Sequence, residues 1–233
     1  MKDPRWWNNK AAELLRVQES SCKYGDHKCN TNRKLWQPLP QDLYKLNFDT
    51  VVFSDLNCSG FGAIIRNSAG EVMARMLAKG DHVHNNEEAE ALACLKAVEF
   101  SMDAGFSNLV IEGDNLNVMR AILSSAASNS LLGHIVDDIR YYISGREYVS
   151  FSCVQRGGNM VAYSLAKFAR NIGEDMYGVE DEPPPTLDAL YHDRLHINER
   201  VICSFSKKKK IHILIQDNTH FLLFIYLFLS LSK

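Results

Sequence analysis

The sequence has no C-x-x-C pair, no apolar run long enough to cross a bilayer and no excess of basic residues. The six cysteines are scattered and the first ten residues are polar, so we expect no secretory signal peptide and free thiols in a reducing compartment inside the cell. Residues 221–231 are apolar but fall short of the roughly 20 residues that span a bilayer. We therefore expect no membrane association, with a short membrane anchor as the alternative. The residues do not distinguish nucleus from cytoplasm.

The lack of a basic excess bears on the partner. Lys and Arg number 26 against 28 Asp and Glu, and residues 43–181 carry 11 basic and 18 acidic residues, a net charge of −7. Simple nucleic-acid binders are usually strongly basic. Tight binding would need the basic residues of the second half to share one face, and the alternative is that they are ordinary solvated surface. These residues are Arg146, Arg156, Lys167 and Arg170.

Proline and charge divide the chain into three parts. Residues 1–42 lack periodicity, end in a Trp- and Pro-containing stretch at 36–40, and are expected to be a poorly ordered leader or linker. Within them, Cys22, His27 and Cys29 lack a fourth ligand at a usual zinc spacing, so a loop with coincidental cysteines is expected. Residues 182–233 begin with three prolines and contain a lysine run at 207–210, which is a weak nuclear-import signal and more often a solvated patch.

Residues 43–181 have the periodicity of an α/β domain. A strand at 45–53 and a hairpin of 60–66 with 71–77 predict an antiparallel start. A helix capped by Asn86 follows, with Gly105 after its end. The remaining segments alternate between strand and helix, with strands at 109–111 and 148–153 and helices at 115–123, 132–143 and 160–172. This order predicts a mixed five-stranded sheet, its later strands added through helical crossovers, with helices flanking it.

Three acids stand where these elements should meet. Asp49 lies within the first strand, Glu90 near the start of the first long helix, and Asp114 just after the strand at 109–111. Each alone is more often a cap or turn residue. Together they would repel one another unless a cation neutralised them, and carboxylate oxygens are the ligands that Mg²⁺ prefers. The three acids therefore predict a divalent-metal site.

The order of short motifs resembles the ribonuclease H family, in particular the reverse-transcriptase-like domains that are abundant in plant genomes and related to retroelements. The resemblance covers about residues 36–190 and includes the Trp and Pro lead-in at 36–40. The matching blocks are KLNFD at 45–49, GFGAIIRN at 60–67, EAEALA at 88–93, IEGDN at 111–115 and QRGGNMVAYSLAK at 155–167.

This resemblance implies a ribonuclease H-like fold and hydrolysis of the RNA strand of an RNA–DNA hybrid by two Mg²⁺ ions. Asp49 would be the metal-bridging acid, Glu90 the ligand carried on a helix, and Asp114 the acid after the fourth strand. The hybrid would be recognised through phosphates and 2′-hydroxyl groups without base reading. The residues expected to contact nucleic acid are Asn115, Arg156, Asn159 and Lys167. No protein partner is implied, and a monomer is expected.

The sequence departs from the family pattern at three positions. Tyr163 stands where the family has its fourth acid, and a neutral phenol is a poor Mg²⁺ ligand. Cys153 replaces a mobile histidine, and Thr50 replaces the glycine after the first acid. Impaired cleavage is therefore the expectation. A non-catalytic nucleic-acid-binding module and a decayed retroelement fragment are the alternatives.

Overall fold

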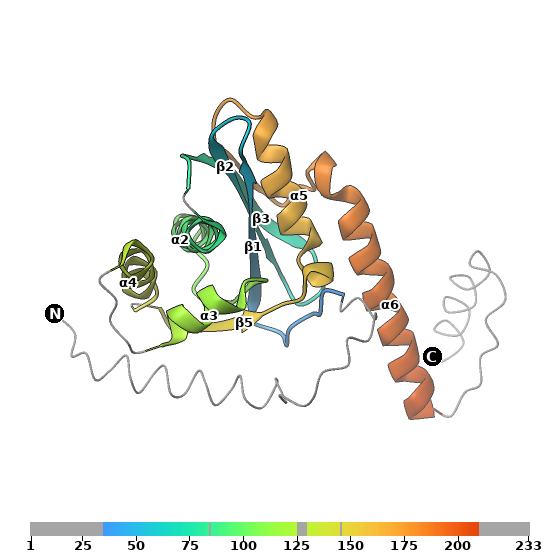
Figure 1. Cartoon of the computed structure of the whole chain (residues 1–233). Helices are drawn as coiled ribbons and strands as arrows, with labels where there is room; N and C mark the ends of the chain where they lie inside the picture. Colours follow the sequence, from blue (N-terminus) through green and yellow to red (C-terminus); the bar gives the residue numbers. More distant parts are fainter. Residues whose placement is uncertain (1–34, 84, 125–129, 145, 210–233) are drawn as a thin grey trace, which may run out of the picture. The chain divides into compact units, whose positions relative to one another are not determined.

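An antiparallel meander begins the sheet (Figure 1). Strands β1 (Tyr44–Phe53), β2 (Cys58–Arg66) and β3 (Val72–Gly80) follow one another through short turns, as the hairpin signal predicts. The computed structural model describes residues 35–83, 85–124, 130–144 and 146–209.

Helix α2 (Asn86–Asp103) crosses over to the second half of the sheet. Its N-cap is Asn85, whose side chain accepts a hydrogen bond from the backbone N–H of Glu88, so the predicted cap, Asn86, was one residue too late. Adjacent asparagines make both positions chemically suitable. Gly105 follows the helix with a φ of 79°, a left-handed conformation that favours glycine and ends the helix as predicted.

The second half of the sheet is parallel to β1. Strand β4 (Asn108–Gly113) pairs with β1, and β5 (Tyr148–Cys153) pairs with β4, with α3 (Leu116–Leu123) and α4 (Leu131–Ile143) in the connection. The order is β5-β4-β1-β2-β3-β6, so the sheet has six strands and the predicted five was wrong. The extra strand, β6 (Met176–Val179), is short and largely exposed and has no apolar alternation that sequence could detect.

Helices cover both faces of the sheet, and each face has its own hydrophobic core (Figure 1). Helices α2, α3 and α4 pack on one face around Phe48, Ile111 and Ile139. Helix α5 (Met160–Phe168) packs on the other around Ile64 and Leu165. A 3-10 turn, η2 (Ala169–Asn171), follows α5. The α-helix therefore ends at Phe168, before the end of the predicted helix at 160–172.

Two glycines in β2 let α5 approach the sheet closely. A Cβ atom at Gly62 would lie 2.3 Å from the backbone oxygen of Ala162 and from the backbone nitrogen of Ala166. A Cβ atom at Gly60 would lie 2.4 Å from the oxygen of Ala166. Gly62 is also the partner of Asp49 in the β1–β2 ladder. The helix is therefore seated directly over the strand pair that carries the first acid.

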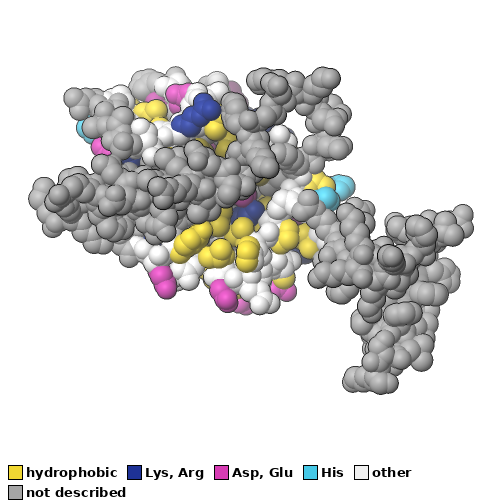
Figure 2. All heavy atoms as spheres, turned by 90° about the horizontal axis from the view of Figure 1, so that it is seen from below, with side chains coloured by type: hydrophobic (Ala, Val, Ile, Leu, Met, Phe, Trp, Pro, Cys, Tyr) yellow, Lys and Arg dark blue, Asp and Glu magenta, His cyan; other side chains and the backbone are white. Residues whose placement is uncertain are grey.

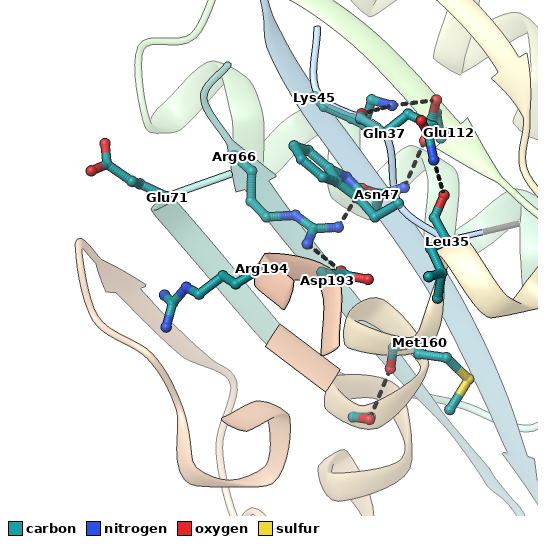
Figure 3. A network of polar contacts seen from close by, with 12 residues as sticks. Leu35, Gln37, Lys45, Asn47, Arg66, Glu71, Glu112, Met160, Asp193 and Arg194 are labelled. Carbon is teal, nitrogen blue, oxygen red and sulfur yellow. Dashed lines mark hydrogen bonds and ion pairs between the residues drawn. The ribbon is translucent and has the colours of Figure 1, made fainter. Parts of the chain in front are cut away.

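A buried polar network joins both ends of the described domain to β1 (Figure 3). The Arg66 guanidinium, from β2, donates to Asp193 at 2.7 Å and to the Asn47 oxygen at 3.2 Å. Asn47 donates in turn to Glu112, which also pairs with Lys45 at 2.9 Å. Each of these charges is buried with an opposite partner, which is the condition under which buried charge is tolerated.

The network includes residues outside the predicted domain bounds of 43–181. Trp36 is fully buried, donates to the Asn47 oxygen and lies 4.1 Å from the Arg66 guanidinium. Asp193 belongs to α6 (Leu187–Lys209), which follows β6 after a loop and one 3-10 turn, η3 (Pro184–Thr186). The chain divides into two compact units at Arg194 and Leu195, within α6, and the sheet and its helices belong to the first.

None of the helices in the described ranges is long and apolar enough to span a bilayer. The predictions for Cys22, His27 and Cys29, for the lysine side chains at 207–210 and for residues 221–231 lie outside what the structure describes.

We expect Asp193→Ala to lower the free energy of unfolding by about 3–5 kcal/mol, because it leaves the fully buried Arg66 cation without its carboxylate. Asp181→Ala is the matched control, since Asp181 pairs with an arginine of the next strand, Arg75, but is half exposed. It should change the free energy by less than about 1 kcal/mol. Urea denaturation of the two variants measures both values, and equal losses would contradict the buried network's contribution.

Candidate active site

The register of the sheet places Asp49 and Asp114 side by side. Strands β1 and β4 pair in parallel as far as Asn47 and Glu112, and β4 ends at Gly113. Asp49 and Asp114 each lie two residues beyond the last pair, where the two strands separate. Glu90 enters from the second turn of α2. One carboxylate oxygen from each of the three acids lies within 4.8 Å of the other two.

Two donors hold the Asp49 carboxylate in place. The backbone N–H of Thr50 donates to one oxygen at 2.8 Å, and the Asn159 side chain donates to the other at 3.0 Å. Thr50, which replaces the family's glycine, does not have a positive φ, so a residue with a side chain fits here. The Thr50 hydroxyl donates to the Gly60 oxygen at 3.1 Å. The threonine is therefore accommodated beside Asp49.

Asn159 is buried, whereas a residue that contacts nucleic acid was expected to be exposed. It is fully buried at the start of α5, and its amide nitrogen also donates to the backbone oxygen of Phe48 at 2.8 Å. No surface is left for contact with a ligand's backbone. The residue instead ties the start of α5 to β1 and orients Asp49.

Burial and mutual repulsion raise the pKa of two of the acids. Asp49 is 2% exposed, and burial, with the Asp114 carboxylate adding to it, raises its pKa to about 7. Burial raises the pKa of Glu90 to about 9, with contributions from Asp49 and Asp114. The Arg156 cation opposes both shifts. Asp49 and Glu90, two buried acids with a third carboxylate close by, are unfavourable as anions without a cation.

One oxygen of Glu90 is particularly informative. Glu90 is 7% exposed, and its Oε2 atom is buried with no hydrogen-bond partner among the described residues. Buried polar atoms are rarely left unsatisfied in folded proteins. Three carboxylates with an unsatisfied oxygen are a donor set that suits a hard divalent cation such as Mg²⁺.

Cys153 and Asn115 lie at the edge of the acidic cluster. The Cys153 thiol lies 3.8 Å from the backbone oxygen of Asp114, so the position expected of the family's histidine is next to the third acid. Asn115 caps α3, with its side-chain oxygen accepting from the backbone N–H groups of Asn117 and Val118. Its amide oxygen therefore serves the helix.

Tyr163 does not join the acids. Its ring lies under the Arg156 guanidinium, 4.7 Å from the ring centroid, in a cation–π contact. Among the described residues, no fourth Asp, Glu, His or Cys completes the group of Asp49, Glu90 and Asp114. The structure thus brings three carboxyl side chains together at this site, with an aromatic residue at the fourth family position.

Two of the four basic residues considered in the sequence are engaged within the domain. Arg146 donates to the Phe106 oxygen, the Val98 oxygen and the Ser101 hydroxyl, so it ties the end of α2 to the loop that precedes β4. Arg170 pairs with Asp55. Arg156 and Lys167 are exposed.

Figure 2 shows how the charged and hydrophobic side chains are distributed on one face of the molecule. Lys and Arg side chains form small separate groups there, hydrophobic side chains gather over one area, and acidic side chains lie along the lower margin and also near the upper one. The described part of this face is no broad basic surface, in keeping with the acidic balance of residues 43–181.

Sequence reasoning identified the three acids but missed how they are held. The positioning role of Asn159 had one usable signal, because an asparagine directly before a helix is a frequent cap. Here its side chain makes no cap hydrogen bond and reaches the neighbouring strand instead. The stacking of Arg156 on Tyr163, seven residues apart across a 3-10 turn (η1, Arg156–Gly158), had no local signal.

Solved structures with a similar fold are ribonucleases H. The ribonuclease H1 of the archaeon Halobacterium salinarum NRC-1 superposes with a TM-score of 0.51 at 23% identity, covering 55% of this chain and 98% of that one. The N-terminal ribonuclease H domain of rv2228c from Mycobacterium tuberculosis gives 0.49 at 17% identity, covering 55% and 92%. LC11-RNase H1, solved in complex with an RNA/DNA hybrid, gives 0.48 at 17%, covering 53% and 94%. The first of these likenesses shows a ribonuclease H-like fold.

The comparison with curated proteins found no match. A family model described as reverse transcriptase-like matches residues 47–169, which is more than half of the chain and includes Asp49, Glu90, Asp114 and the start of α5. The chain belongs to the reverse transcriptase-like family, whose ribonuclease H-like fold it shares.

Proposed function

We propose that the protein is a ribonuclease H-type endonuclease that hydrolyses the RNA strand of an RNA–DNA hybrid, with a turnover limited by its incomplete ligand set. The observation that carries the proposal is the convergence of Asp49, Glu90 and Asp114 within 4.8 Å at the place where β1 and β4 separate. Family membership supports the substrate class, because the matched segment contains all three acids.

The residues of the site have distinct tasks in this proposal. Asp49 is held by Thr50 and Asn159, so its carboxylate keeps one orientation toward the other two acids. Glu90 and Asp114 supply the remaining anionic ligands from α2 and from the loop after β4. A divalent cation bound by the three acids would offset most of their negative charge and polarise the phosphodiester and the attacking water. The rigid strand, rather than a loop, sets the position of the central acid.

Tyr163 and Cys153 support the limit on turnover. In the family, four carboxylates hold two metal ions, and here the fourth is replaced by a phenol that contacts Arg156. Phenols and thiols are poor ligands for hard cations at neutral pH. The Cys153 thiol also cannot move a proton as an imidazole does near neutral pH.

The same replacements favour a second candidate, a nucleic-acid-binding module without cleavage. Such a module would bind a hybrid with an affinity that falls steeply as salt rises. Its affinity would not change when Mg²⁺ is added or when Asp49 is replaced by asparagine.

The pKa shifts predict how stability depends on pH when no metal is bound. The pKa of Asp49 is about 7 and that of Glu90 about 9 in the folded protein, both above the ordinary values of these side chains. Between about pH 4 and 9 the folded state therefore binds more protons than the unfolded state, and the free energy of unfolding falls as pH rises. We expect a fall of at least about 1.4 kcal/mol in EDTA between pH 5.5 and 8.5, the equivalent of one pKa unit.

Urea denaturation at the two pH values measures this fall. Millimolar Mg²⁺ should reduce it by stabilising the ionised acids at high pH, and Glu90→Gln should flatten it by removing the charge that burial disfavours. A parent chain whose pH dependence in EDTA matches that of Glu90→Gln would show that Glu90 titrates normally.

Cleavage assays on a labelled RNA–DNA hybrid test the proposed activity. We expect slow, Mg²⁺-dependent cleavage by the parent chain, abolished by Asp49→Asn. Tyr163→Asp should raise the rate at least about tenfold, because it restores the fourth carboxylate, and the double variant with Cys153→His should raise it further. Tyr163→Phe is the control that changes the same residue without adding a ligand, and it should bring no gain.

Two results separate the candidates. If the parent chain cleaves fast and Tyr163→Asp cleaves at the same rate, the proposal that the missing fourth carboxylate limits turnover is wrong. Absence of cleavage in the parent and in the double variant, with salt-dependent hybrid binding retained, would leave the binding module.

A further inference from the structure

We propose that Arg156, stacked on Tyr163, forms a phosphate-binding site beside the three acids and provides the positive charge that a second metal ion provides elsewhere in the family. Tyr163 is then a positioning residue for the guanidinium. The substrate class, the phosphodiester backbone of a nucleic acid, rests on the proposed function.

The local backbone sets the geometry of the pair. Arg156 begins the η1 turn, and the Asn159 N–H donates to its backbone oxygen at 3.1 Å. The Tyr163 N–H donates to the backbone oxygen of Asn159 at 3.0 Å, one turn further along. Asn159 is itself fixed to Asp49, so Arg156 and Tyr163 both keep a defined position relative to the acids.

The Arg156 guanidinium has no acceptor of its own. Unlike Arg66, Arg75 and Arg170, it pairs with no carboxylate and donates no hydrogen bond among the described residues. Its contact is the face of the Tyr163 ring, which leaves the edge of the guanidinium with its N–H groups available. Arg156 is exposed, and its charge acts on both Asp49 and Glu90.

Charge balance supports the assignment. Four carboxylates and two divalent ions, the arrangement that the family resemblance implies, carry no net charge. Three carboxylates, one divalent ion and one guanidinium also carry no net charge. Replacing the fourth acid by an aromatic residue that holds an arginine therefore removes a negative charge and keeps a positive one close by, which preserves the electrostatic condition for an anionic substrate.

Guanidinium chemistry points to phosphate as the ligand. The planar fork of arginine matches two oxygens of a phosphate, and stacking on an aromatic ring leaves that fork free to bind. An exposed cation close to these acids would otherwise be expected to form an ion pair with one of them. The guanidinium instead lies over the Tyr163 ring and forms no ion pair with a described carboxylate, although its charge acts on Asp49 and Glu90.

A second arginine provides a matched control. Arg170 also lies over an aromatic ring, that of Phe53, at 5.7 Å, and comes from the turn that ends α5. Its guanidinium is already paired with Asp55. Replacing Arg170 therefore removes an arginine that lies over an aromatic ring but is already paired with a carboxylate. Replacing Arg156 removes one that lies over a ring and has no such partner.

The first test measures binding of a fluorescein-labelled RNA–DNA hybrid by anisotropy in EDTA over a series of salt concentrations. Arg156→Gln should weaken binding about fivefold or more and reduce the salt slope by about one, as expected for loss of one phosphate contact. Tyr163→Leu should reproduce this loss because the guanidinium is no longer held. Tyr163→Phe should retain parental affinity within about twofold, as should Arg170→Gln.

The second test titrates Mn²⁺ alone into the protein by calorimetry, with no nucleic acid present. We expect one ion per parent chain and two per Tyr163→Asp chain. Two ions on the parent chain would overturn the proposal. So would parental hybrid affinity in Arg156→Gln, parental affinity in Tyr163→Leu, a loss in Tyr163→Phe equal to that in Tyr163→Leu, or no measurable hybrid binding by the parent.

Neither readout depends on cleavage, so the two proposals fail separately. A chain that does not cleave but shows the expected pattern of variants keeps the Arg156 site and loses the nuclease activity. A chain that cleaves but binds hybrids equally well without Arg156 keeps the activity and loses the phosphate site.

Discussion

The close seating of α5 on β2 is the constraint on which the candidate site depends. It is possible only because Gly60 and Gly62 have no side chains where the backbone of α5 passes. Gly62 stands opposite Asp49 in the β1–β2 ladder, so the start of the helix reaches the central acid through the Asn159 amide. The packing of α5 on β2 therefore orients the Asp49 carboxylate through Asn159. The same segment of the chain contains Arg156 and Tyr163, which contact each other.

The opposite face contributes the most unfavourable group. Helix α2 places the carboxylate of Glu90 in a buried position with one oxygen unsatisfied, while the small residues Ala89, Ala91 and Ala93 allow the helix to pack closely. A domain selected for stability alone would place an apolar side chain there. Retention of the acid is the pattern expected where a bound cation, rather than the protein, satisfies the group.

Local patterns predicted most of the fold, and long-range polar contacts account for what they missed. The meander, the crossover helices and the three acids follow from apolar periodicity and from acids placed at strand and helix ends, all of which are properties of short windows. The partnership of Trp36, Arg66 and Asp193 joins residues far apart in the sequence and leaves no periodic trace, so Trp36 was assigned to a leader and Asp193 to an extension. The stacking of Arg156 on Tyr163 was not predicted for a related reason. The sequence shows that Tyr163 replaces the family's acid, but it does not show which residue the tyrosine contacts.

The short strand β6 has an effect on behaviour in solution. It pairs with Ala74 to Leu77 and so covers the middle of β3, the strand that the meander would otherwise leave open at the edge. The new edge strand, β6, is four residues long, contains Gly178 and follows directly on the acidic residues Glu174 and Asp175. Very short edge strands next to acidic residues are poor templates for a strand of another molecule. The sheet is thereby protected against edge-to-edge aggregation on this side, by an element too small to contribute much to the core.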